Sequence, residues 1–125
     1  MINGIIFDLD GTLIDTFNTQ LKSWREAFEK VGSTLDTDKF INNFGKSYKD
    51  FTFSIDPSLT NLDINEVIQT NKKLMQERSN EYSLFPESKK ILETLNEKRI
   101  ICMIASSNPR HVSESLLKQF QIDHL

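Results

Sequence analysis

Near its N-terminus the chain reads Ile5-Ile6-Phe7-Asp8-Leu9-Asp10-Gly11-Thr12, an apolar run that passes directly into an acidic turn. Residues 2–7 predict a short strand buried on both faces, as in a parallel sheet that helices cover. Residues 8–15 predict a polar loop. In open α/β sheets, ligands bind beyond the carboxyl ends of the strands. The two carboxylates of this loop therefore lie where such a sheet places a ligand site.

Helical spacing of apolar residues follows the loop. Five apolar residues between 16 and 31 recur every three or four positions and share one helical face, which Gly32 ends as a C-cap. This face consists of Phe17, Leu21, Trp24, Phe28 and Val31. We expect three further helices before residue 84: one from Asp36 or Thr37 to near Gly45, one over about 47–54, and a long one with Asp63 as N-cap and Glu66 as its capping-box partner.

The remainder of the chain alternates helix and strand. Pro86 suits the first turn of a helix that runs to about Lys98, and residues 100–105 predict a second apolar strand. Pro109 opens another helix, and residues 121–125 are expected to begin a third strand. This alternation predicts a parallel α/β sheet, whereas residues 16–84 show no strand pattern and predict a separate, inserted helical unit.

Composition and charge exclude several classes of protein. The net charge of −3 argues against nucleic acid as a partner. No apolar stretch approaches the length of a membrane span, and the N-terminus lacks a secretory signal, so a cytoplasmic protein is expected. Cys102 is the one cysteine, which excludes an internal disulfide. It lies within an apolar run and is predicted to be a buried structural thiol.

The acidic turn is best explained by a bound cation. Two neighbouring carboxylates need a proton or a metal ion between them, and Mg²⁺ with oxygen ligands meets that need. An Asp-Gly turn would explain Gly11 but not Asp8. A calcium-binding loop that starts at Asp8 is excluded, because it would place Leu13 at the obligatory glycine and Thr19 at the bidentate glutamate.

A second polar cluster follows the predicted strand 100–105. Hydroxyl groups at the end of a strand, before a helix N-terminus, suit a phosphate group. The alternative is that Ser107 or Asn108 simply caps the helix that Pro109 opens. The residues alone leave both interpretations open.

Residues 5–15 resemble the first motif of the haloacid dehalogenase (HAD) superfamily, Asp-x-Asp-Gly-Thr after a hydrophobic strand. The resemblance implies that Asp8 is the nucleophile that forms an aspartyl-phosphate, and that Asp10 is the general acid and base. It also implies that the Asp8 carboxylate and the Asp10 backbone carbonyl bind Mg²⁺. The implied phosphate ligands in this loop are Leu9, Gly11 and Thr12.

Residues 104–110 resemble the second motif of this superfamily, an apolar strand that ends in Ser or Thr. Ser106 then binds the phosphoryl oxygens, and Ser107 and Asn108 either assist it or cap the next helix. Arg110 is expected to be a surface residue. His111 and His124 lack partners at metal-ligand spacing and are read as structural or surface residues.

The resemblance also implies the domain organisation. A partial, Rossmann-like parallel sheet is formed by residues 1–15 and 85–125, and residues 16–84 form an inserted all-helical C1-type cap. Such caps close over the active site and recognise the substrate. Gly45-Lys46-Ser47 resembles the cap segment of phosphoglycolate phosphatases, pyrophosphate phosphatases and β-phosphoglucomutases. Lys46 therefore either meets a substrate anion or is a solvated lysine after a helix.

The implied function is a Mg²⁺-dependent phosphohydrolase, similar to phosphoglycolate phosphatase, that acts on a small phosphorylated metabolite. The alternatives are a phosphomutase of the β-phosphoglucomutase type and an inactive fragment that only binds phosphate or a partner. The lysine of the third motif and the acidic pair of the fourth have no counterpart after Arg110, since Lys118 comes too early. We therefore expect a truncated gene product, a proteolytic remnant or a recombinant piece with impaired activity. The strand at 2–7 is then expected to self-associate through its exposed edge.

Overall fold

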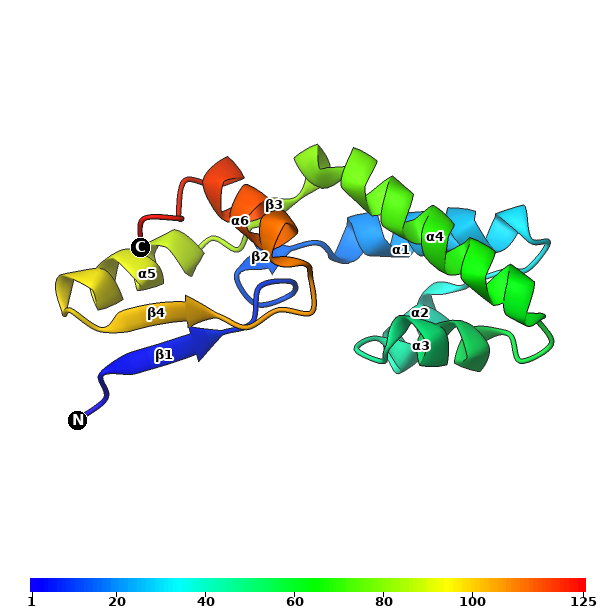
Figure 1. Ribbon diagram of the computed structural model, residues 1–125, viewed down its shortest axis with the longest axis horizontal. Helices are drawn as coiled ribbons and strands as arrows, with labels where there is room; N and C mark the ends of the chain where they lie inside the picture. Colours follow the sequence, from blue (N-terminus) through cyan, green and yellow to red (C-terminus); the bar gives the residue numbers. More distant parts are fainter. The chain divides into compact units, whose positions relative to one another are not determined.

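The computed structural model describes residues 1–125, in which four short strands and six α-helices alternate with loops (Figure 1). The elements in chain order are β1 (Gly4–Phe7), β2 (Ile14–Asp15), α1 (Phe17–Lys30), α2 (Thr37–Asn43), α3 (Tyr48–Ile55), α4 (Asn61–Glu77), the 3-10 helix η1 (Ser79–Glu81), β3 (Ser83–Leu84), α5 (Ser88–Glu97), β4 (Ile101–Ile104) and α6 (Arg110–Gln119). The predicted α/β class is confirmed. None of the helices combines the length and apolarity needed to cross a bilayer.

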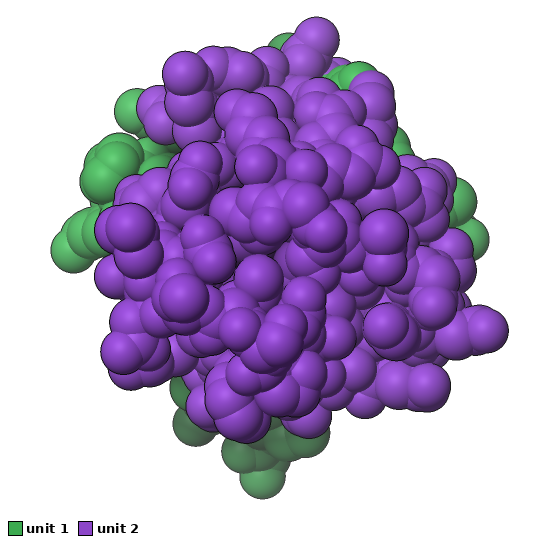
Figure 2. Space-filling model, turned by 90° about the vertical axis from the view of Figure 1, so that its right-hand side faces the viewer, with its two compact units in different colours: residues 1–16, 81–125 green, residues 17–80 purple.

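The chain divides into two compact units, coloured separately in Figure 2. The sheet unit comprises residues 1–16 and 81–125, and the helical unit comprises residues 17–80. All four strands lie in the sheet unit, together with α5 and α6. The helical unit contains only α1 to α4 and the start of η1.

The sheet unit is built on one parallel strand pair. β1 pairs with β4 in a register that runs from Gly4 opposite Ile101 to Phe7 opposite Ile104. The amide of Ala105 donates to the Phe7 carbonyl at 2.9 Å, so the pairing continues to the last residue of β1. Parallel strands end at the same edge of a sheet. The turns that follow β1 and β4 therefore begin side by side, although the sequence separates them widely.

Only one face of this sheet is covered, and the prediction of a strand buried on both faces is wrong. Ile6, Ile101 and Met103 are 67%, 64% and 57% exposed. Alternate residues on the two strands face the core that α5 and α6 supply through Leu92 and Leu116. The opposite face of the sheet is exposed. Cys102 lies on the covered face and is half-buried rather than fully buried.

The turn after β1 is part of the core, which corrects the prediction of a polar loop over 8–15. Leu9, Leu13 and Ile14 are buried. Ile14–Asp15 forms the short antiparallel pair of β2 with β3. The hydroxyl of Ser88, also buried, donates to the Leu13 carbonyl at 2.8 Å. The turn is therefore anchored from within by apolar side chains as well as by hydrogen bonds.

The third strand expected within residues 121–125 is absent. Gln121 has a left-handed backbone, with φ of 57°, and the amide of Ile122 returns to the Leu117 carbonyl at 2.9 Å. This turn ends α6 and directs the Ile122 side chain into the core. The apolar character of Ile122 that suggested a strand is thus explained by packing beneath the helix end.

Aromatic side chains form the core of the helical unit. Phe28 and Phe40 are fully buried, and Trp24 stacks against Phe51 with a ring-centroid distance of 4.6 Å. These side chains come from α1, α2 and α3, and Val67 of α4 completes the cluster. The predicted helical face over 16–31 is confirmed.

Two helix ends can be compared with the caps that the sequence predicts. Gly32 has φ of +76°, and Ser33 donates its amide to the Phe28 carbonyl, so the predicted C-cap is confirmed. The predicted N-cap of the long helix is wrong. Thr60 caps α4 by accepting a hydrogen bond from the Asp63 amide at 3.1 Å. Asp63 is three residues past the cap, where an acid favours the helix N-terminus.

Candidate active site

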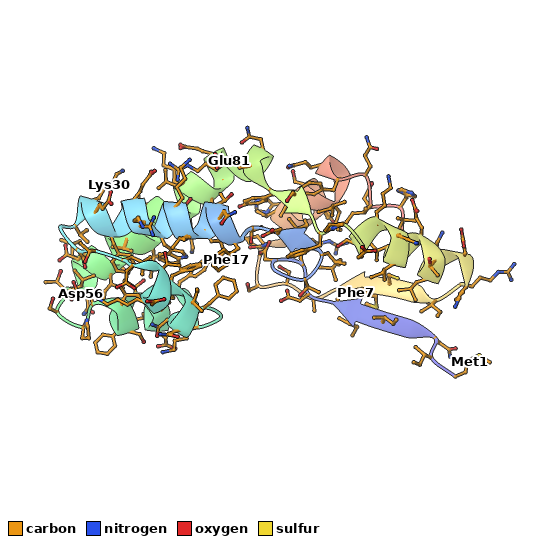
Figure 3. All side chains as sticks on the ribbon, turned by 180° about the vertical axis from the view of Figure 1, so that it is seen from behind. Met1, Phe7, Phe17, Lys30, Asp56 and Glu81 are labelled. Carbon is orange, nitrogen blue, oxygen red and sulfur yellow. The ribbon has the colours of Figure 1, made fainter.

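The candidate site begins where β1 and β4 end. Figure 3 labels Phe7 at the end of β1, from which the acidic turn departs. The turn closes on the Leu9 carbonyl, which accepts the amides of Leu13 and Ile14 at 3.0 and 3.1 Å. Gly11 has φ of +79°, a conformation that side-chain-bearing residues rarely adopt. The sequence forms this turn because Leu9 anchors it in the core and glycine permits the reversal.

Asp8 is the first residue of the turn and is exposed to solvent. Its Oδ1 accepts a hydrogen bond from the Leu9 amide at 2.8 Å. The resemblance predicted that this amide binds a phosphoryl oxygen, whereas here it orients the Asp8 carboxylate. A carboxylate that is both exposed and held in place is suited to attack an incoming electrophile.

Asp10 differs from Asp8 in its surroundings, because it is half-buried and hydrogen-bonded to the turn that follows β4. Nδ2 of Asn108 donates to Oδ2 of Asp10 at 2.8 Å. Burial raises the pKa of the Asp10 carboxyl, and the neighbouring Asp8 charge raises it further, while the hydrogen bond from Asn108 acts in the opposite direction. A carboxyl that keeps its proton to higher pH is suited to general acid catalysis.

The second turn brings Ser106 to the same edge. Ser106 is half-buried, and its Oγ accepts the Asn108 amide at 3.1 Å. Pro109 is the N-cap of α6, and no side chain caps this helix by a hydrogen bond. The alternative in which Ser107 or Asn108 caps the helix is therefore wrong. Ser107 is exposed, and its role as a phosphate ligand stays a prediction.

The structure gives other partners to two amides that the resemblance assigned to phosphate. The Gly11 amide donates to the Ile14 carbonyl at 2.8 Å, and the Thr12 amide donates to the Leu9 carbonyl at 3.3 Å. Both residues are exposed. Gly11 and Thr12 stay predictions as phosphate ligands, and binding through their amides would require the turn to open.

Two acids are available for a metal ion, and no group of three or more metal-ligating side chains gathers in the chain. Mg²⁺ is commonly held by one or two carboxylates, with water and substrate phosphate completing its shell. The Asp8 carboxylate and the Asp10 carbonyl are hard oxygen donors, and the electrostatic repulsion between the two acids favours a cation beside them. The donor set therefore fits Mg²⁺.

Lys46 lies in the helical unit, between α2 and α3. Its exposed Nζ donates to Asn43 Oδ1 at 2.8 Å and to Ser54 Oγ at 3.1 Å. Two neutral acceptors hold this cation and leave its charge unneutralised. The contact of Lys46 with a substrate anion stays a prediction.

The remaining candidates lie on the surface of the sheet unit. Arg110 is exposed and pairs with Glu114 at 2.7 Å, one helical turn away, so the expectation of a surface residue is confirmed. His111 and His124 are also exposed. The sequence left open whether Asn108 assists Ser106 or caps the next helix, because the direction of a polar side chain before a helix cannot be predicted from its residue type.

Comparisons with known proteins identify the family of the chain. A family model described as haloacid dehalogenase-like hydrolase matches residues 5–125. Pyrophosphatase PpaX from Oceanobacillus iheyensis is 32% identical over 111 residues, which cover 88% of this chain and 50% of that protein. The chain spans about half the length of the curated relatives that it matches.

Two solved structures share the fold. A predicted phosphoglycolate phosphatase from Haemophilus somnus has a TM-score of 0.85 at 22% identity, over 98% of this chain and 59% of that one. A haloacid dehalogenase-like family hydrolase from Streptococcus pneumoniae has a TM-score of 0.84 at 24% identity, over 98% and 58% of the two chains. At these identities the likeness concerns the fold, and it confirms the expected α/β class. Since the family model extends from the first strand to the last residue, the chain belongs to the haloacid dehalogenase-like hydrolase family.

Proposed function

We propose that this protein is a Mg²⁺-dependent phosphohydrolase that cleaves a small phosphorylated metabolite through an aspartyl-phosphate. One observation carries the proposal: Asn108 joins Asp10 and Ser106, at 2.8 and 3.1 Å, directly beside the exposed carboxylate of Asp8. A nucleophile, an acid of raised pKa and a hydroxyl that can hold phosphate thus converge at the ends of two parallel strands. A pyrophosphatase and a predicted phosphoglycolate phosphatase among the similar proteins also favour phosphate substrates.

The proposed reaction has two steps. In the first, an Asp8 carboxylate oxygen bonds to phosphorus while the bond from phosphorus to the leaving oxygen breaks, and Asp10 gives its proton to that oxygen. In the second, Asp10 takes a proton from water as the water oxygen attacks phosphorus. The acyl-phosphate bond then breaks, which releases phosphate and restores Asp8. Ser106 donates a hydrogen bond to a phosphoryl oxygen throughout.

The metal would be held by the Asp8 carboxylate and the Asp10 backbone carbonyl. When bound, Mg²⁺ neutralises negative charge on the phosphoryl group. The proposed substrate is a phosphoester or phosphoanhydride, since an exposed Asp8 carboxylate can attack the phosphorus of either. We propose separately that Lys46 of the helical unit, whose charge its two neutral acceptors leave unneutralised, contacts a substrate anion.

The proposal is tested by phosphate release from this chain. The substrates are 4-nitrophenyl phosphate, pyrophosphate, 2-phosphoglycolate and β-glucose 1-phosphate, each with Mg²⁺ and with excess chelator. We expect release with Mg²⁺, none with chelator, and recovery when Mg²⁺ is added back. Consumption of β-glucose 1-phosphate without release would favour the phosphomutase alternative. Phosphate binding without turnover of any substrate would favour the inactive, phosphate-binding alternative.

We also propose that the chain self-associates through the exposed edge of β1, next to the uncovered sheet face. On that face Ile6, Ile101 and Met103 are 67%, 64% and 57% exposed, and β1 pairs on one edge only. Exposed apolar surface next to an unpaired strand edge favours pairing with a second copy.

Sedimentation equilibrium tests the association. We expect a concentration-dependent dimer, which Ile6→Lys converts to a monomer because the charge would be buried in the interface. Leu62→Lys, at a residue 77% exposed in the helical unit, is the matched control and should leave the dimer intact. A stable monomer of the unsubstituted chain at all concentrations would contradict the proposal.

A further inference from the structure

We propose that Asn108 is a positioning residue, which sets the direction of the Asp10 proton and of the Ser106 hydroxyl. The inference rests on the proposed function, in which Asp10 is the acid and Ser106 holds the phosphoryl group. Asn108 contacts both, because its side-chain Nδ2 reaches Asp10 at 2.8 Å and its backbone amide reaches Ser106 Oγ at 3.1 Å. The positions of Asp10 and Asn108 are 98 residues apart in sequence.

The bond to Asp10 selects one carboxyl oxygen. An asparagine Nδ2 is a donor, so Oδ2 of Asp10 must act as an acceptor in this contact. When Asp10 is protonated, the proton is then favoured on Oδ1, the oxygen that does not face a donor. Asn108 therefore fixes which oxygen carries the transferable proton, and rotation of the carboxyl group would cost this hydrogen bond.

The bond to Ser106 acts on the hydroxyl in the same way. A serine hydroxyl has one hydrogen and two lone pairs. Because Oγ accepts from the Asn108 amide, the hydrogen of Ser106 points to another acceptor. At this sheet edge a phosphoryl oxygen is such an acceptor, so the backbone of Asn108 prepares Ser106 as a donor.

The Asn108 side chain does not cap the helix that follows it. It lies one residue before Pro109, the N-cap of α6, and that helix has no side-chain cap. The side chain is half-buried and directed to the acidic turn rather than to the helix. Its removal should therefore disturb the site more than the fold.

The test uses the dependence of the reaction on its leaving group. Phenolate needs the proton of Asp10 to depart, whereas 4-nitrophenolate departs with little help. Asn108→Leu removes the donor at similar size. We expect it to lower kcat/KM for phenyl phosphate at least about tenfold more than for 4-nitrophenyl phosphate, since general acids contribute ~10²–10⁴-fold. KM should change little, and Asn108→Gln, which keeps an amide donor, should recover part of the loss.

The control is Asn96→Leu, the same change at an exposed site on α5. It should leave kcat/KM for both substrates unchanged. Equal losses on both substrates in Asn108→Leu would overturn the inference, because a purely structural role would not discriminate between leaving groups.

A second measurement separates the inference from the proposed function. Nuclear magnetic resonance of the 15N-labelled chain should show a downfield, slowly exchanging side-chain amide proton for Asn108, which Asp10→Ala returns to the shift of the exposed Asn96. An Asn108 amide that already matches Asn96 would overturn the inference whether or not the chain has activity. Absence of turnover in the unsubstituted chain would count against the proposed function alone.

Discussion

Replacement of Phe28 by alanine is expected to lower the free energy of unfolding of the helical unit by about 3–5 kcal/mol. Phe28 is fully buried in α1, and its ring lies 6.3 Å from that of Trp24 and 6.4 Å from that of Phe51. The substitution removes apolar burial and leaves a cavity that the surrounding rings can fill only in part.

The loss is large in proportion to the stability of such a unit. A unit the size of residues 17–80 buries a smaller share of its surface than a larger domain does, and whole domains are stable by only ~5–15 kcal/mol. We therefore expect Phe28→Ala to leave the helical unit largely unfolded at physiological temperature, while the sheet unit retains its own core of Leu9, Leu92 and Leu116.

The measurement is urea denaturation followed by Trp24 fluorescence, because Trp24 is the one tryptophan of the chain and lies in this core. Phe53→Ala is the matched control. It makes the same change in α3 at a ring that is 55% exposed, and should cost less than about 1 kcal/mol. Equal midpoints for the two variants would contradict the assignment of Phe28 to the core.

The sequence predicts this core because a long helix repeats its apolar residues regularly. Residues 16–31 carry the pattern over four turns, and Gly32 marks the end where the left-handed conformation is needed. The same applies to the strand at 100–105, whose apolar run appears as β4. Periodicity and chain reversal are local properties, and a local pattern is sufficient to predict them.

The features that were missed depend on distant parts of the chain. β2 (Ile14–Asp15) and β3 (Ser83–Leu84) are strands of two residues each. A strand this short shows no periodic pattern in the sequence. The predicted burial of Ile6 was too high, because the apolar sequence of a strand does not show whether helices cover one face of the sheet or both. At the long helix, Thr60 and Asp63 are both good caps, and the choice between them is made by where α4 starts.

The candidate site also has parts that the sequence predicts and contacts that it does not. Asp8, Asp10 and Ser106 could be proposed from short motifs, since each follows an apolar strand. Their juxtaposition depends on the parallel pairing of β1 with β4, which the strand order implies. The contact of Asn108 with Asp10 depends on side-chain direction, which no sequence pattern carries. The partners of the Gly11 and Thr12 amides are likewise set by the closure of the turn.

Replacement of Asp8 by asparagine is expected to reduce phosphate release by at least about a thousandfold, as loss of a catalytic nucleophile does. Asparagine keeps the size of the side chain, and its Oδ1 can still accept the Leu9 amide that holds Asp8 at 2.8 Å. The turn and the contact of Asp10 with Asn108 should therefore persist. A carboxamide is too weak a nucleophile to form the acyl-phosphate bond, so the first step stops.

Asp123→Asn is the matched control, because it makes the same change at an exposed acid of the sheet unit outside the site. It should leave phosphate release unchanged. Unchanged release in Asp8→Asn would instead show that another group attacks phosphorus.

Trapping gives a readout of Asp8 that does not require turnover. Beryllofluoride binds to carboxylates as an analogue of the phosphoryl group, and 19F nuclear magnetic resonance reports the bound form. We expect a Mg²⁺-dependent signal from the unsubstituted chain and from Asp123→Asn, and none from Asp8→Asn. The three outcomes separate the roles of the site. Signal with turnover supports the full reaction, while signal without turnover shows that the site binds a phosphoryl analogue without completing the reaction, as the phosphate-binding alternative expects. Signal that persists in Asp8→Asn would remove Asp8 from the role of nucleophile, because the beryllofluoride must then bind another oxygen.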